Sequence, residues 1–239
     1  MITQVLFGEL VKILVSKEKW LKIEINTDGY QCWVDRQQIV LLSDKEYKQF
    51  LDSTFQISED ILMPVNYVNK NQLIPIVLGS RIYNFNEENL HSKVGDFEYE
   101  INGHVRDIPK KVNRNKLIED SFLYLNAPYL WGGKSPLGID CSGFVQMVYG
   151  LNGFQLPRDA YQQAELGQAL SFIEEAEEGD LAFFDNQEGK ITHVGIILKD
   201  HRIIHASGKV RIDRMDHQGI YRNEDKDYSH SLRIIKKIF

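Results

Sequence analysis

Short runs that alternate apolar and polar residues dominate the first 110 positions of the chain. Residues 20–25 read Trp-Leu-Lys-Ile-Glu-Ile, Asp28-Gly29 is a turn signal, and residues 30–39 form a further extended run. The same pattern predicts strands over residues 5–14, 73–80, 82–85 and 96–101. One short helix fits between residues 44 and 60. The spacing predicts two small all-β barrels in series, over residues 1–43 and 44–109.

Helical periodicity replaces this pattern after Pro109. We expect helices over residues 113–126, 140–151 and 160–170. Strands are expected over residues 180–184, 193–198, 202–206 and 232–239. Helices followed by antiparallel strands indicate an α+β domain over residues 110–239.

Composition narrows the class of protein. The chain has 239 residues, a hydrophobic fraction of 43% and a formal net charge of -6. These values are typical of a globular protein and argue against a nucleic-acid partner or an anionic membrane surface. No apolar run is long enough to span a bilayer, and the first residues show no secretory signal.

Cys141 is the strongest candidate for chemistry. It follows a glycine-rich loop and begins a predicted helix, with Asp140 as the expected N-cap. Free N–H groups at a helix start favour a thiolate and can bind an oxyanion. The other cysteine, Cys32, is expected to be a buried apolar residue, although a disulfide between the two remains open.

Two histidines in one predicted hairpin are candidates for the base. A two-residue loop would put His193 and His205 on opposite faces of the hairpin. A three-residue loop over residues 199–201 pairs Leu198 with Arg202 and puts the two histidines on the same face. His193 can then act as general base while His205 fixes its ring and tautomer. A zinc site made by Cys141 and these histidines is the alternative, but no CxxC or HExxH element supports it. The remaining histidines are expected to lie on the solvated surface: His91, His104, His201, His217 and His230.

Several motifs in this order resemble the NlpC family of papain-like cell-wall cysteine peptidases, over roughly residues 110–239. The resemblance implies a catalytic triad of Cys141, His193 and His205, without a metal or organic cofactor. It also implies cleavage of the bond between γ-D-glutamate and a diamino acid in peptidoglycan peptides. The motifs are Tyr129-Leu130-Trp131-Gly132-Gly133, Asp140-Cys141-Ser142-Gly143-Phe144, Gly179-Asp180-Leu181, His193-Val194-Gly195-Ile196 and Ile204-His205-Ala206.

The first half is similar to the bacterial SH3-like domains that precede such peptidase domains. Residues 156–160, Leu-Pro-Arg-Asp-Ala, resemble a branch that requires a free N-terminal L-alanine, with Asp159 receiving its ammonium group. The alternative is that Asp159 caps the helix predicted from Ala160. The resemblance places five further residues in the substrate site: Tyr30, Tyr129, Trp131, Asp140 and Ser142.

About 43 residues is short for a complete SH3-like barrel. We therefore expect either a truncated N-terminus or an irregular first barrel. The expected enzyme is a monomeric cytoplasmic peptidase that recycles murein peptides. The alternatives are a periplasmic or secreted wall hydrolase, a non-catalytic wall-binding protein, and an acyltransferase or amidase that uses the same cysteine.

Overall fold

A computed structural model describes residues 1–239, and contacts divide the chain into two compact units. The N-terminal unit comprises Gln4–Ile108. The C-terminal unit comprises Pro109–Phe239 together with Met1–Thr3. The division of the first half into two domains at residue 43 stays a prediction.

The C-terminal unit is built around a sheet with the strand order β13-β19-β14-β15-β16-β17-β18. An additional pairing between β18 and β19 closes six of these strands into an antiparallel barrel. The strands are β13 (Gln168–Leu170), β14 (Leu181–Asp185), β15 (Ile191–Leu198), β16 (Arg202–Ser207), β17 (Lys209–Met215), β18 (Gly219–Arg222) and β19 (Asp227–Lys237). A two-stranded ribbon, β11 (Lys134–Ser135) with β12 (Gly138–Ile139), precedes this sheet.

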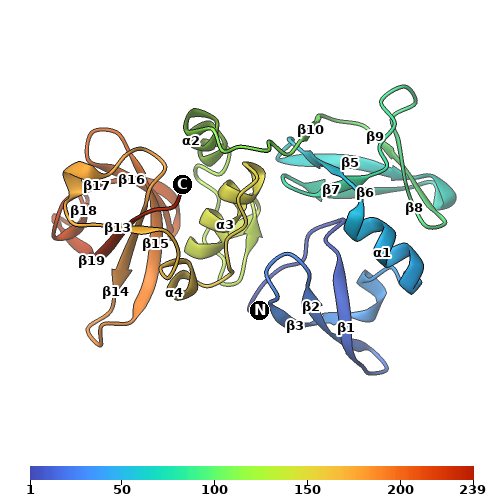
Figure 1. The fold of residues 1–239 in the computed structure, drawn as a ribbon, viewed down its shortest axis with the longest axis horizontal. Coiled ribbons are helices and arrows are strands. Elements are labelled where there is room, and N and C mark those ends of the chain that lie inside the picture. The colour runs from blue at the N-terminus through green and yellow to red at the C-terminus, as the bar shows by residue number, and fades with distance from the viewer. The chain divides into compact units, whose positions relative to one another are not determined.

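Helix α3 (Cys141–Leu151) packs on β15 and β16, and α2 (Arg114–Phe122) packs against α3 (Figure 1). Every residue of α3 except Gly150 is buried, which is typical of a helix enclosed on all sides. The first residue of this helix is therefore held in place by the unit's interior. The remaining helical segments are α4 (Ala160–Gln163) and the 3-10 turn η3 (Ile173–Glu175).

Three small antiparallel sheets make up the N-terminal unit, with strand orders β1-β2-β3, β10-β4-β7 and β6-β5-β9-β8. Alternate residues of β2 (Trp20–Ile25) are buried, as its sequence predicts, and they pack with Cys32. Ser43 and Glu46 form a capping box at the start of α1 (Asp44–Asp52), which confirms the short helix. The other elements are β1 (Val11–Ser16), β3 (Gln31–Asp35), η1 (Arg36–Gln38), β4 (Phe55–Ser58), β5 (Leu62–Tyr67), η2 (Val68–Lys70), β6 (Gln72–Val77), β7 (Arg81–Tyr83), β8 (His91–Val94), β9 (Phe97–Ile101) and β10 (Val105–Asp107).

Two expectations about the C-terminal elements are wrong. The helix predicted over residues 160–170 ends at Gln163, because Gly167 takes a left-handed φ of 70° and residues 168–170 pair with β19 as strand β13. The sequence pattern also missed β17 and β18, which supply two of the barrel's strands. The first difference arises from a pairing between distant parts of the chain, whereas β17 and β18 pair with strands that neighbour them in sequence.

Candidate active site

Cys141 is the first residue of α3, and Asp140 is its N-cap. One Asp140 oxygen accepts the N–H of Gly143 at 2.7 Å, while the other accepts the N–H of Gly132 at 2.8 Å. A single carboxylate thus joins the glycine-rich loop to the first turn of the helix, which confirms the predicted cap. The cap fixes the position of the Cys141 side chain.

The ionisation of Cys141 differs from the expected thiolate. Burial raises the pKa of the Cys141 thiol to about 11, and the negative charge of Asp140 acts in the same direction. Backbone N–H groups of Val194 and Ser142 lower the pKa but do not outweigh these effects. Both cysteines are free thiols, so the disulfide between Cys32 and Cys141 is absent. The free site therefore favours the thiol, whose proton needs an acceptor.

The hairpin of β15 and β16 has the predicted register. Leu198 pairs with Arg202, and Gly195 pairs with His205. His193 Nε2 then lies 2.8 Å from His205 Nδ1, with both rings buried. The predicted juxtaposition of the two histidines is confirmed, whereas their catalytic roles stay predictions.

Cys141 and His193 share a pocket of about 340 Å³. Because His193 Nε2 is engaged by His205, its Nδ1 is the ring nitrogen left to exchange a proton with the thiol. Burial lowers the pKa of His193 well below its ordinary value, and His205 and His230 lower it further. The Cys141 thiol and the His193 ring are thus both neutral at pH 7, and this arrangement allows a proton to pass between them. The pocket is lined by Tyr129, Cys141, Thr192, His193, Ala206, Ser207, Gly208 and His230.

His230 belongs to this pocket, so its assignment to the solvated surface was wrong. Its ring stacks on that of His193, with centroids 4.1 Å apart and planes at 26°. Burial lowers the pKa of His230 to about 4, and His205 and Arg222 contribute. No sequence pattern predicts this contact, because His230 lies in a polar stretch of β19, and closure of the barrel pairs that strand with β14 and β18.

Asp213 is a second site residue that the sequence analysis missed. It lies on β17, and its Oδ2 is 2.9 Å from His205 Nε2. Burial opposes ionisation of Asp213, but hydrogen bonds from His205 and Arg211 outweigh it and lower its pKa to about 2. A charged carboxylate therefore stands behind the two histidines at neutral pH.

A buried ion pair supports the start of α3 from its other side. Arg158 donates to Ser142 Oγ at 2.9 Å and to Thr3 Oγ1 at 3.1 Å, and it pairs with both oxygens of Asp140. Arg158 is only 2% exposed and Asp140 only 6%. Asp140 and Ser142, expected in the substrate site, thus both face this cation, and neither is among the residues that line the pocket.

The other expected substrate residues lie in different surroundings. Asp159 is at the N-cap position of α4, where its N–H donates to Gln162 Oε1 at 3.3 Å, and its roles as a cap and as a substrate ligand both stay predictions. Tyr129 lines the pocket, and its pKa is raised to about 12 by burial first and then by Cys141 and Asp140. Trp131 is 69% exposed and is absent from that lining. Tyr30 belongs to the N-terminal unit, where it packs against a buried cluster.

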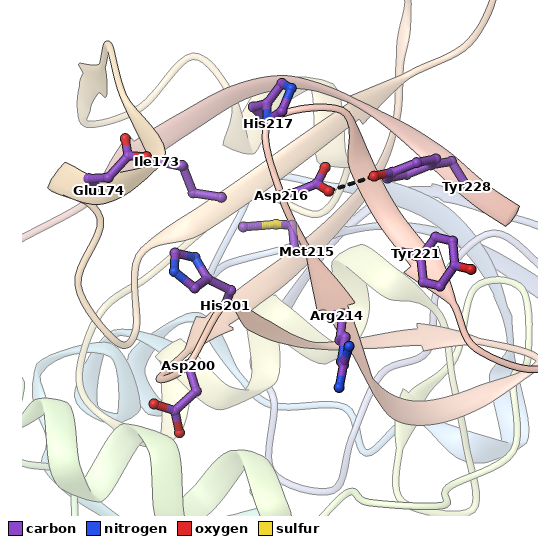
Figure 2. Close-up of a pocket in the computed structure, with 10 residues that line it drawn as sticks. All are labelled: Ile173, Glu174, Asp200, His201, Arg214, Met215, Asp216, His217, Tyr221 and Tyr228. Carbon is purple, nitrogen blue, oxygen red and sulfur yellow. Dashed lines mark hydrogen bonds between the residues drawn. The ribbon is translucent and has the colours of Figure 1, made fainter. Parts of the chain in front are cut away.

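A second hollow of the C-terminal unit lies among residues of η3, β17, β18 and β19 and the 199–201 loop (Figure 2). His201 and His217 border it, and Tyr228 Oη donates to Asp216 Oδ2 at 2.5 Å. It contains neither cysteine. No group of three His, Cys, Asp or Glu side chains has an arrangement that could hold a metal ion. None of the helices has the length and apolar character that a membrane span requires.

Two family models match the chain. Residues 126–227 match the model described as the NlpC/P60 family, and residues 1–39 match the bacterial dipeptidyl-peptidase Sh3 domain. Residues 126–227 thus carry an NlpC/P60 domain, which is a cysteine peptidase domain, and the chain has an N-terminal SH3-like domain.

Two curated relatives have the same name, gamma-D-glutamyl-L-lysine dipeptidyl-peptidase. The protein of Bacillus cereus (strain ATCC 10987 / NRS 248) is 27% identical over 230 residues, which cover 85% of this chain and 66% of the relative. The protein of Bacillus subtilis (strain 168) is 28% identical over 222 residues, which cover 85% of this chain and 71% of the relative. The chain thus spans about two thirds of the length of these relatives.

A crystal structure of an NlpC/P60 family protein from Bacillus cereus ATCC 10987 has a similar fold. The two structures superpose with a TM-score of 0.82 at 24% identity, over 99% of this chain and 81% of that chain. At this identity the similarity establishes the fold, which is papain-like and includes an SH3-like domain.

Proposed function

We propose that the chain is a cysteine endopeptidase that hydrolyses the γ-D-glutamyl–diamino acid bond of peptidoglycan-derived peptides with a free N-terminal L-alanine. One observation carries the proposal: Cys141 shares a pocket with His193, whose ring is held by a hydrogen bond from its far nitrogen to His205. The names of the two curated relatives support the choice of bond. Within the fold class, we retain α+β for the peptidase domain.

The chemistry follows from the two neutral partners. His193 Nδ1 takes the proton of the Cys141 thiol as the sulfur attacks the γ-D-glutamyl carbonyl, and N–H groups at the start of α3 stabilise the oxyanion. The imidazolium then gives this proton to the leaving amine of the diamino acid. His193 next activates a water molecule, which hydrolyses the thioester and restores the thiol. No step requires a metal or an organic cofactor.

In the proposal Asp159 receives the ammonium group of the N-terminal L-alanine. An ionised carboxylate has about four acceptor sites, so one side chain at the N-cap of α4 can both cap the helix and bind an ammonium group. Tyr30, Tyr129, Trp131, Asp140 and Ser142 are proposed to bind or shape the same peptide. A free peptide substrate suits a cytoplasmic recycling enzyme that acts as a monomer, and we include both points in the proposal.

The test uses L-Ala-γ-D-Glu-diaminopimelate, its L-lysine counterpart, and the N-acetylated form of each. Products are identified by mass spectrometry with the wild type and with Cys141→Ala. We expect release of the diamino acid from the free peptides only and no product with Cys141→Ala. Equal cleavage of the free and the acetylated peptides would support the peptidase activity but refute the requirement for a free N-terminal amine. It would favour a wall hydrolase. No cleavage of any peptide by folded, reduced protein would refute the proposed function.

The role of Asp159 has its own variant. Asp159→Asn removes the charge but keeps a side chain that can cap α4, so we expect a KM for the free peptide higher by about 10- to 100-fold. Asp185→Asn is the control, because that carboxylate's partner is the exposed Arg233, at 3.7 Å. An unchanged KM in Asp159→Asn would leave Asp159 with the capping role alone.

A further inference from the structure

Behind the two histidines, a line of charged groups extends away from the pocket along β17. His205 Nε2 contacts Asp213 Oδ2 at 2.9 Å, and Arg211 Nε contacts the same oxygen at 2.7 Å. Arg211 Nη2 also donates to Asp213 Oδ1 at 2.8 Å and to Glu224 Oε2 at 2.8 Å. The Asp213 side chain is 6% exposed and that of His205 is fully buried. A buried carboxylate thus joins an arginine to the proposed catalytic histidines.

This arrangement determines which ring nitrogens carry protons. An ionised carboxylate only accepts hydrogen bonds, so His205 must donate its Nε2–H to Asp213. A neutral His205 then has a lone pair on Nδ1, which accepts the Nε2–H of His193 at 2.8 Å. With its proton on Nε2, His193 has a lone pair on Nδ1. That lone pair is what removal of the Cys141 proton requires.

Arg211 keeps Asp213, the first group in this series of hydrogen bonds, in its ionised form. Its guanidinium remains charged at every working pH and offers donors in a fixed planar fork. By binding both Asp213 oxygens it keeps the carboxylate ionised and holds it toward His205. Glu224 in turn pairs with Arg211 at the exposed end.

We propose that Asp213, held by Arg211, is a positioning residue that sets the tautomers of His205 and His193 and stabilises the imidazolium formed on His193. The inference rests on the proposed function for its effect on catalysis, but not for its effect on the tautomers. Asp213 acts through His205 and does not line the pocket. The titratable and charged groups that face His205 are His193 of β15, Arg211 and Asp213 of β17, Arg222 of β18 and His230 of β19.

The experiment compares wild type with Asp213→Asn, an isosteric change that lets an amide donate to His205 Nε2. Such a donor turns His205 into its Nδ1–H tautomer, which opposes the Nε2–H of His193. We expect kcat to fall on the order of 10²- to 10⁴-fold, with KM changed less than about threefold. The matched control is Asp216→Asn, three residues further along the chain, whose carboxylate binds exposed Tyr228 and not a histidine.

Tautomers are read independently of activity, from the side-chain ¹⁵N shifts of labelled histidine. We expect Nε2–H for both His193 and His205 in wild type and in Asp216→Asn, and a changed pattern in Asp213→Asn. Arg211→Gln is the second variant, and it leaves the Asp213 carboxylate in place. Without the arginine's charge, His205 should protonate at a higher pH.

The outcomes are distinguishable. Unchanged tautomers in a folded Asp213→Asn protein would overturn the inference, even if kcat fell. If that variant does not fold, an unchanged His205 titration in Arg211→Gln overturns it instead. If the tautomers change in Asp213→Asn but the wild type cleaves no peptide, the inference about the histidines is supported and the proposed function is refuted.

Discussion

Arg158 binds both carboxylate oxygens of Asp140, with Nη1–Oδ1 at 3.0 Å and Nη2–Oδ2 at 2.6 Å. The pair joins the residue after Pro157 to the N-cap of the helix that begins with Cys141. The position of the Cys141 side chain therefore depends on a cation 17 residues further along the chain.

Arg158→Met is expected to lower the free energy of unfolding by about 3–5 kcal/mol, because it leaves the Asp140 carboxylate buried without its cation. Urea unfolding at pH 7 measures this change. Arg202→Met is the matched control: its pair with Asp200 is exposed and 3.5 Å long, so we expect a loss below about 1 kcal/mol. Equal losses in the two variants would contradict the role given to the buried pair.

Alkylation of Cys141 by iodoacetamide should become faster as the pH rises. Only the thiolate reacts, and burial beside Asp140 raises the thiol's pKa to about 11. The rate constant should therefore increase about tenfold per pH unit between pH 7 and pH 9. Peptide mapping separates this reaction from that of Cys32. A plateau below pH 8 would show instead that the free enzyme holds a thiolate.

Acid should destabilise the protein at a pH well above the ordinary range for carboxylates. The pKa values of His193, His205 and His230 are all lowered by burial, so in this window the unfolded chain binds protons that the folded chain does not. Stability from these groups is complete above about pH 6.5 and is lost as the pH falls from there toward their folded pKa values. Urea unfolding between pH 7 and pH 5 should show a declining free energy. A flat profile would indicate that the histidines are already charged in the folded state.

The stack between His230 and His193 has a separate test. His230→Ala should lower kcat by about 2- to 12-fold, the equivalent of an aromatic contact of 0.5–1.5 kcal/mol. His230→Phe keeps a ring against His193 and should retain most activity. Because it removes one of the three histidines that take up a proton on unfolding, the free energy of unfolding should fall less in acid. Equal kcat values in the alanine and phenylalanine variants would show that the stack has no part in catalysis.

Two glycines of α3 provide an internal comparison. A Cβ at Gly143 would lie 2.3 Å from the Gly133 carbonyl oxygen and 2.9 Å from Asp140 Oδ1, whereas at Gly150 it would meet nothing within 4 Å. Gly143→Ala should therefore cost about 1–3 kcal/mol of stability and displace the start of the helix. Gly150→Ala should be neutral or stabilise by up to about 1 kcal/mol. Thermal unfolding of both variants measures the difference, and similar midpoints would contradict the close approach at Gly143.

Local signals made part of the site predictable. Asp140 before Cys141 is a helix start that the neighbouring residues specify, and a three-residue loop fixes the register of His193 and His205. The same reasoning did not predict that the Cys141 thiol is buried, and this burial raises its pKa to about 11.

Closure of the barrel brings His230 and Asp213 into the site, and the sequence alone does not predict their positions. His230 and Asp213 occur in polar stretches, and polar residues in a strand normally indicate its solvent face. Asp213 points inward only because His205 and Arg211 satisfy it, and His230 reaches His193 through pairings of β19 with β14 and β18. Such partners lie on other strands, so no pattern within one strand identifies them.

The contact between Thr3 and Arg158 has a consequence for biosynthesis. Met1–Thr3 belongs to the same compact unit as Pro109–Phe239, and Thr3 Oγ1 accepts a hydrogen bond from Arg158 across 155 residues of sequence. A ribosome that adds 5–20 residues per second needs about 8–30 s to reach Arg158 after it has made Thr3. During that interval the N-terminal unit can fold, whereas Thr3 cannot yet form its hydrogen bond with Arg158. The proposed peptidase unit is thus completed late in synthesis, after the unit that interrupts it in sequence.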